Sequence, residues 1–469
     1  MEKSLKINLF IYMAISAVSF AYLVLPENAG ISVPIWAVIQ LICLYRIVPK
    51  KKPLLLFIPI MILAFNSFIS ANSMWRISNF LIIMVLYSVM CLMMVDRFSV
   101  KEVSLRFIYH TLENIVNPLR YFSLPFKWCA DTDKAYIKII KRVLIGIAIT
   151  APCLLFVSIM LASADSVFFY DMNHFVSRKL FYLINFNAVS KILYGILVGI
   201  YLFGLGYIMH IPPKEETVER KTKNGDLIIL NILLVSILVI YTIFVVIQFR
   251  YLFAGAALPY GLSFTEYARQ GFFELLFLSG LNILLILITV YLTKEKQGLW
   301  HKITKGLCSY LCLVTMILLL SSFYRMWLYN ADDGLTRLRF LVFGFLIFES
   351  IGLIITFFYI IKPVFNIIAV YLLIGLFYYT ILNMIPIDRI VAKNQIDLYL
   401  NHKNVGIEYV LTLSPDAAEE ILRIKDDAVF GSKAACYLEN LNKYYTGIPN
   451  RWQRFNLSLN KALEISRQQ

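Results

Sequence analysis

Charged side chains gather at the start of a long apolar run in the segment YNADDGLTRLRFLVFGFLIFE, residues 329–349. Asp332 precedes Arg337 and Arg339, and Glu349 lies about 15 Å deeper if the run is an α-helix that rises 1.5 Å per residue. Arginine binds phosphate and carboxylate groups through paired hydrogen bonds. A carboxylate at membrane depth is by default a candidate proton or ligand site. The spacing therefore predicts a charged membrane entrance with an acidic group below it.

Other polar residues lie at the ends of neighbouring apolar runs and join this group. Interhelical ion pairs that fix packing, and arginines that reach up to the membrane surface, are the structural alternative. We predict that the group forms an outward-facing ligand-binding pocket made of Arg269, Glu274, Arg325, Asp332, Arg337, Arg339, Glu349, Asp388 and Asn394.

The elements that must position these residues are membrane-spanning helices. The chain has 469 residues, of which 60% are hydrophobic and 16% charged, and its mean hydropathy is +0.73. A soluble domain averages about 25% charged residues, so this chain has too few to cover a water-exposed surface. Runs of about twenty apolar residues predict an all-α, polytopic membrane bundle of about eleven transmembrane helices with a small helical C-terminal extramembrane tail. The predicted spans are 7–25, 31–48, 53–70, 78–95, 143–164, 189–209, 227–249, 271–292, 304–327, 340–361 and 363–383.

Lysine and arginine are concentrated in alternate loops, such as RIVPKKKP at 46–53 and the segments 96–142 and 210–226. Basic loops stay on the cytoplasmic side of a membrane. We therefore expect a multi-pass protein of the plasma membrane with a cytoplasmic N-terminus. The span count then places the C-terminal tail outside the cell.

Four regions follow from these patterns. We predict an N-terminal four-span region at 1–95, a cytoplasmic amphipathic interfacial segment at 96–142 and a seven-span core at 143–383. The polar tail at 384–469 is the fourth, and within it Ser414 and Pro415 predict the start of a helix.

Several function classes lack their motifs. The sequence contains no GxxxxGK phosphate loop, no HExxH and no GxSxG, and its five histidines lie in separate segments. Cys308 and Cys312 lie one helical turn apart without a neighbouring His or Asp, so we interpret them as packing residues. We predict no metal site and no cofactor. The net charge of +15 fits cytoplasmic loops, and we expect no nucleic-acid partner.

Five sequence blocks resemble a family of bacterial polytopic membrane proteins. The chain is similar over about residues 140–430 to the family of domain of unknown function 4173, a relative of the 4153 group. The resemblance implies a membrane architecture and no particular reaction, and it favours a site on the outer face, where these blocks lie. The blocks are LASADSVF (161–168), YARQGFFELL (267–276), DDGLTRLR (332–339), NMIPIDRIVAKNQID (383–397) and YVLTLSPDAAEEIL (409–422).

Three functions remain open at this point. The first is a transporter or a protein that handles lipids or anionic ligands, with Glu274 or Glu349 coupling a proton. The second is a non-enzymatic scaffold or sensor that docks a partner through its tail. The third is a transferase that uses a lipid-linked donor, with Asp332 or Asp388 as the base. Membrane lipids and an anionic or lipid-linked ligand are the expected partners.

Overall fold

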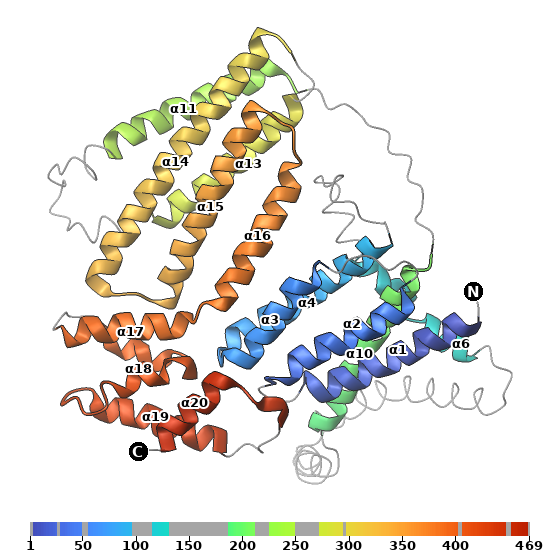
Figure 1. Cartoon of the computed structure of the whole chain (residues 1–469). Helices are drawn as coiled ribbons and strands as arrows, with labels where there is room; N and C mark the ends of the chain where they lie inside the picture. The colour runs from blue at the N-terminus through green and yellow to red at the C-terminus, as the bar shows by residue number, and fades with distance from the viewer. Residues whose placement is uncertain are drawn as a thin grey trace, which may run out of the picture.

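The computed structural model describes the helical framework of the chain. The described residues are 3–25, 29–48, 55–95, 115–130, 186–211, 225–248, 272–293, 297–401, 406–446 and 452–467. Within these ranges the regular structure is entirely helical. The prediction of an all-α polytopic bundle is confirmed, and Figure 1 shows two groups of long helices with a set of shorter helices at one end.

The first group buries one continuous apolar core, which includes Tyr12, Trp36, Leu63 and Phe203. A short segment, η2 (Asn117–Tyr121) and α6 (Leu124–Ala130), packs against this group through Trp128. The helices of the first group are α1 (Lys3–Leu23), α2 (Ser32–Ile47), α3 (Phe57–Ile69), α4 (Ser73–Met94) and α10 (Phe186–Ile208).

The second group has its own core, built around Leu311, Leu346 and Leu353. The two groups meet where the last helix of the second group packs against α3. The helices of the second group are α11 (Leu227–Gln248), α13 (Phe272–Thr293), α14 (Leu299–Asp333), α15 (Arg337–Ile361) and α16 (Ile367–Met384).

Ten of the eleven predicted spans coincide with these helices, and the fifth, 143–164, lies outside the described residues. Eight of the helices are long and apolar enough to cross a membrane, whereas α2 and α3 are shorter. Helix α14 has 35 residues and is therefore about 52 Å long, more than the ~30 Å of the hydrocarbon layer. Its ends must extend into the headgroup regions.

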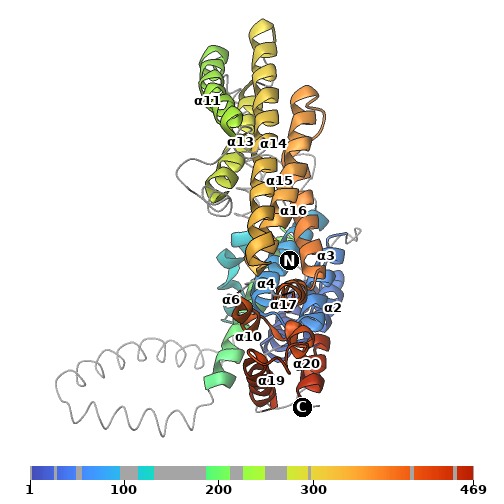
Figure 2. The same ribbon diagram turned by 90° about the vertical axis from the view of Figure 1, so that its left-hand side faces the viewer.

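The tail is a compact cap of short helices rather than a loose extension. Figure 1 shows α17 (Ile387–Leu400) running across the ends of α15 and α16, with the later helices beyond it. Figure 2 shows these helices at the opposite end of the molecule from the start of α14. The later elements are η6 (Ile407–Thr412), η7 (Pro415–Ala417), α18 (Ala418–Leu422), α19 (Gly431–Thr446), η8 (Trp452–Arg454) and α20 (Leu457–Arg467).

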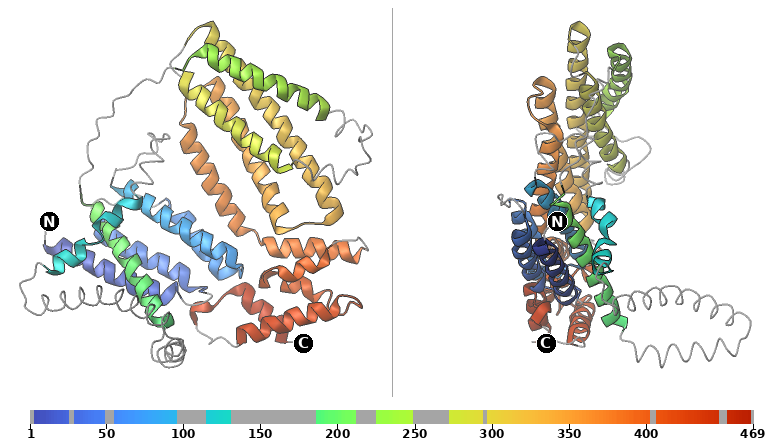
Figure 3. Two further views of the ribbon diagram at one scale, coloured as in Figure 1. Left: turned by 180° about the vertical axis from the view of Figure 1, so that it is seen from behind. Right: turned by 90° about the vertical axis from the view of Figure 1, so that its right-hand side faces the viewer.

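The tail also contacts the first group of helices, as the rear view in Figure 3 shows. The peptide N–H of Gly30, between α1 and α2, donates to the Gln453 carbonyl at 2.8 Å. The Asn456 amide donates to the carbonyls of Ser67 and Ser70, at the end of α3, at 2.9 and 2.8 Å. The α1–α2 and α3–α4 turns therefore lie on the same side as the tail.

Candidate functional site

Asp388 lies at the centre of the charged group predicted at the membrane entrance. Its carboxylate forms a two-pronged ion pair with Arg337, with Nε at 2.6 Å from Oδ1 and Nη2 at 2.7 Å from Oδ2. The side chain of Asp388 is 0% exposed and that of Arg337 is 26% exposed. Because paired guanidinium–carboxylate bonds are directional, they fix the start of α15 on the first turn of α17.

Two further donors complete the surroundings of Asp388. Its Oδ2 accepts hydrogen bonds from Asn72 Nδ2 and from the peptide N–H of Ser414, both at 3.1 Å. Asn72 caps α4, and Ser414 precedes η7. One buried carboxylate therefore joins both groups of helices to the tail. This geometry favours a structural role for Asp388 and leaves little access for a substrate.

The turn between α14 and α15 begins at Gly334, directly after α14 ends at Asp333. Gly334 has a φ of 76°, and a Cβ added there would lie 2.8 Å from Gln395 Nε2. Asn394 Oδ1 accepts a hydrogen bond from the Leu335 peptide N–H at 2.8 Å. Thr336 caps α15 by accepting from the peptide N–H of Arg339. Two neighbouring residues of α17 thus hold the turn that carries the entrance arginines.

Arg339 is occupied within the same turn. Its Nη2 lies 3.1 Å from Asp333 Oδ2, and its guanidinium carbon lies 3.8 Å from the centre of the Tyr329 ring. Nη1 also donates to the Gly334 carbonyl. Both Arg337 and Arg339 therefore have protein partners that compete with any anionic ligand.

Glu349 is separate from this ion-pair group and lies midway along α15. It is 5% exposed, and Ser279 Oγ on α13 donates to its Oε1 at 2.8 Å. Among the described residues, Oε2 has no hydrogen-bond partner. An unsatisfied buried oxygen costs roughly 1–3 kcal/mol, and more if it is charged. Glu349 is thus an incompletely satisfied carboxyl group in the centre of the second helix group.

A line of buried polar side chains continues from Ser279 along α13 and α14. Asn282 Nδ2 donates to Thr315 Oγ1 at 3.0 Å, and Tyr241 of α11 donates to Asn282 Oδ1 at 3.0 Å. Further along α13, Thr289 is fully buried and its Oγ1 has no hydrogen-bond partner within the described ranges. The interface of α11, α13 and α14 is therefore polar on the C-terminal side of Ser279.

The remaining predicted residues are dispersed around these features. Arg269 lies outside the described residues, and so does the side chain of Asp332. Glu274 is exposed in the first turn of α13, and Arg325 is buried on α14 with 4% exposure. Asn394 is half-buried. The structure brings Arg337 together with Asp388, and it places Asn394 beside the same turn.

Several residues of these networks were absent from the predicted site. Ser279 and Asn282 could have been found, because they lie three residues apart, on one face of a helix, inside an apolar run. Asn66, Asn79 and Asn383 each lie within an apolar run, and their amides join α3, α4 and α16: Asn79 Nδ2 donates to Asn383 Oδ1 at 2.7 Å. The hydrogen bonds of Asn72 and Ser414 with Asp388 could not be found from the sequence around any of the three residues.

Comparison with protein families gives one match. A family model described as "Domain of unknown function (DUF4153)" matches residues 57–424. The matched region runs from α3 to the end of α18, and it includes Ser279, Arg337, Glu349 and Asp388. Comparison with curated proteins and with solved structures finds no match.

Proposed function

We propose that this chain, which belongs to the family of domain of unknown function 4153, is a membrane transporter in which Glu349 binds the coupling proton. The chain is a multi-pass integral membrane protein, with eight helices suited to cross a bilayer. The single observation that carries the proposal is the carboxyl group of Glu349, which is buried midway along a spanning helix and has one oxygen without a partner.

A purely structural carboxylate at this depth would be expected to have a cationic partner. In the described residues, Glu349 has only the neutral Ser279 hydroxyl, while Arg337 and Arg339 bind aspartates elsewhere. Proton uptake neutralises an isolated carboxylate in an apolar setting and gives its free oxygen a donor. The carboxyl group of Glu349 can therefore be protonated in one state of the transporter and, when neighbouring helices move, be ionised and paired with a cation in another.

The direction of access follows from the proposed topology. The basic loops indicate a cytoplasmic N-terminus, which places the tail and the Arg337–Asp388 pair on the outer face. Glu349 lies below this face. We propose that protons reach it from the outside when α13 and α15 separate at Ser279.

Charge displacement on a solid-supported membrane tests the role of Glu349 without a known substrate. Liposomes containing the full-length protein are adsorbed on the sensor, and the external pH is lowered in one step. Wild-type protein should give a transient current as protons bind. The E349Q variant should lose most of this current, because an amide cannot take up a proton in this pH range.

E274Q is the matched control, because Glu274 is an exposed carboxylate in the first turn of α13, the same helix that carries Ser279. It should retain the transient current. An E349Q current equal to that of wild-type protein would contradict the proposal. A current lost equally in both variants would assign it to surface carboxylates and would also contradict the proposal.

A scaffold function is the second candidate, and one observation favours it. The tail is held rigidly on both helix groups, and it exposes Val429 and Tyr444, which are 80% and 63% accessible. Crosslinking of the full chain in cells tests this role. A partner that is lost in V429D and Y444A but retained in E349Q would favour the scaffold, whereas retention in V429D and Y444A would remove it.

A further inference from the structure

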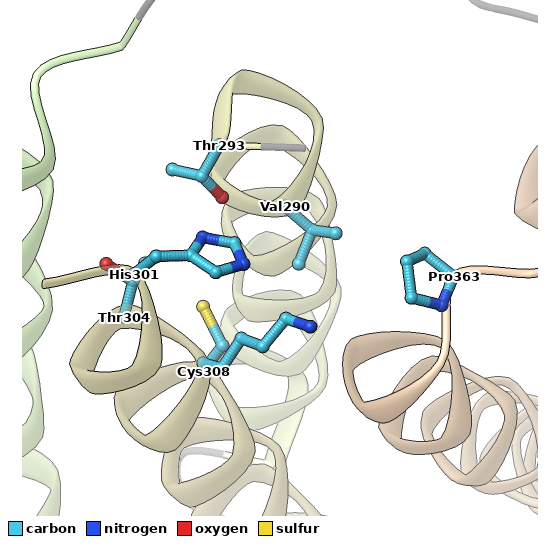
Figure 4. Close-up of a pocket in the computed structure, with 7 residues that line it drawn as sticks. Val290, Thr293, His301, Thr304, Cys308 and Pro363 are labelled. Atoms are coloured by element: carbon cyan, nitrogen blue, oxygen red, sulfur yellow. The ribbon is translucent and has the colours of Figure 1, made fainter. Parts of the chain in front are cut away.

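A small hollow, drawn in Figure 4, lies where α13 ends and α14 begins, and Figure 1 shows this end of the second helix group remote from the tail. It is formed where α13 ends, α14 begins and the chain passes from α15 to α16. Figure 4 shows the His301 ring between α14 and the side chains of Thr293 and Val290, with Pro363 across the opening. The lining residues are Val290, Thr293, His301, Thr304, Lys305, Cys308 and Pro363.

The polar lining of the hollow offers a cationic donor and an imidazole. His301 Nδ1 is buried and has no hydrogen-bond partner among the described residues. Lys305 takes part in no ion pair within the same ranges, although it lies one helical turn from His301. An ammonium group and an imidazole N–H both donate to phosphate oxygens. No described aspartate or glutamate lines the hollow, so its charge is positive.

The start of α14 adds to this preference for an anion. Gly298 is the N-cap residue and provides no side-chain hydrogen bond to the first turn. The free peptide N–H groups of a helix N-terminus carry partial positive charge and attract phosphate.

The rim of the hollow is apolar and exposed. Leu299 and Trp300 are 71% and 52% accessible, and Val364, beside Pro363, is 86% accessible. Tryptophan at a helix end is typical of the membrane interface. Because α14 is longer than the hydrocarbon layer, its first turn reaches the headgroup region. A ligand here would meet acyl chains and a cationic hollow together.

We propose that this hollow binds a phosphate group, and that the phosphate is the headgroup of an anionic phospholipid in the leaflet opposite the tail. Lys305 and His301 donate to the phosphate oxygens, and Leu299 and Trp300 contact the acyl chains. The site is independent of Glu349 and of the transport proposal. Inorganic phosphate offers the same oxygens, and the experiment separates the two sources.

Native mass spectrometry of the full-length protein, released from nanodiscs, tests the site. Nanodiscs of phosphatidylcholine with a minor fraction of phosphatidylglycerol supply the lipid probe. K305Q should lower retained phosphatidylglycerol about fivefold, the factor expected for the loss of one cationic contact at a membrane surface. H301Q should lower it to a smaller extent, and K305R should retain it.

K302Q is the matched control, because Lys302 is exposed on the same helix turn and does not line the hollow. Retention unchanged in K302Q and lowered in K305Q supports the site. Equal loss in K302Q and K305Q, or no loss in K305Q, overturns it. If K305Q fails to fold, H301Q is compared with K302Q instead: loss in H301Q alone supports the site, and equal retention in the two variants overturns it.

A second arm replaces phosphatidylglycerol by inorganic phosphate with phosphatidylcholine alone. If inorganic phosphate binds in a Lys305-dependent way in this arm, and phosphatidylglycerol is not retained in the first arm, the lipid assignment is overturned. Phosphatidylglycerol retention that millimolar phosphate does not displace supports the lipid as the ligand.

Discussion

Asp388 joins three separate parts of the molecule through one carboxylate, and its substitution should be costly. D388N removes the charge that Arg337 faces across the buried pair. We expect a loss of about 3 kcal/mol in the free energy of unfolding, because Arg337 loses its buried counter-charge and an asparagine offers only one acceptor oxygen to the donors around Asp388. Thermal unfolding in detergent micelles measures the change.

D397N is the control on the same helix. Asp397 pairs with Arg423 at 2.8 Å, but both side chains are about 40% exposed, at 42% and 41%. A surface pair of this kind contributes less than about 1 kcal/mol. Equal destabilisation by D388N and D397N would contradict the role assigned to Asp388.

Gly334 holds a backbone conformation that other residues rarely adopt. With φ at 76° and Gln395 Nε2 in the way of a Cβ, G334A should destabilise the protein by at least about 1 kcal/mol. G406A is the control, because Gly406 has a φ of −72° and open space around it. Thermal unfolding should show a lower midpoint for G334A alone, and equal midpoints would contradict this account of the turn.

Single-residue roles were predictable where the chemistry is local. The Gly334 turn and the intramembrane position of Glu349 follow from neighbouring sequence. The partner of Glu349 was not predictable, because Ser279 is 70 residues away in the chain. Arg337 was expected to face a ligand, and its pairing with Asp388 depends on packing between α15 and α17.

At the scale of elements, Asn456 connects two helices of different regions. Its Oδ1 caps α20 by accepting from the Leu459 peptide N–H at 2.9 Å, and its Nδ2 bonds to the end of α3. N456A should increase hydrogen exchange in the first turn of α20 about fivefold, the equivalent of about 1 kcal/mol. N440A is the control, because Asn440 is exposed in α19, and it should leave exchange in α20 unchanged. A similar increase in both variants would contradict the role of Asn456 in joining α20 to α3.

The start of α19 should be sensitive to acid through Asp427. Hydrogen bonds from the Phe430 peptide N–H, the Tyr399 hydroxyl and the Val429 peptide N–H hold the pKa of Asp427 below its usual range. The stability that this group adds is therefore complete above its unfolded pKa of about 3.9 and is lost as the pH falls through the lower folded value. Hydrogen exchange in α19, corrected for intrinsic rates, should increase below about pH 4.

D427N separates this effect from general acid unfolding. An asparagine keeps one acceptor but does not titrate, so the acid-dependent part of exchange at Val429 and Phe430 should be smaller than in wild-type protein. The same pH dependence in both proteins would assign the effect to other carboxylates.

The positions of the helices were the most predictable feature of the fold. Apolar runs of about twenty residues found ten of the described helices, because transfer to lipid dominates their energetics. The ends were less predictable: α14 extends from Leu299 to Asp333, beyond the predicted 304–327, because its ends are polar and no longer in the hydrocarbon layer. The short η elements of the tail contain no long apolar run and were not predictable in this way.

At the scale of the whole molecule, the tail is part of the membrane protein's core rather than an appendage. Residues of α17 and η6–α18, such as Val391, Val410 and Ile421, are fully buried in one cluster. This cluster was not predictable, because it depends on contacts across hundreds of residues, such as Asp416 with Ser70 and the Ala71 peptide N–H. The family match ends at residue 424 and thus includes α17 and α18.

The arrangement places three turns between spans and the tail on one face, and it places the hollow of His301 and Lys305 at the other end. The proposed topology makes the tail face external. Glu349 lies between these two faces, midway along α15. Its access from the tail side is the central claim of this account.

Cysteine accessibility measures this claim most directly. Single cysteines at Glu349, Val429 and Lys302 are placed in a background without native cysteines, and intact cells are treated with a membrane-impermeant thiol reagent. Val429 and Lys302 are exposed markers of the tail face and the opposite face. We predict labelling of V429C at once, slower labelling of E349C, and labelling of K302C only after permeabilisation. Unlabelled E349C beside labelled V429C would contradict outward access to Glu349, and labelled K302C with unlabelled V429C would reverse the topology.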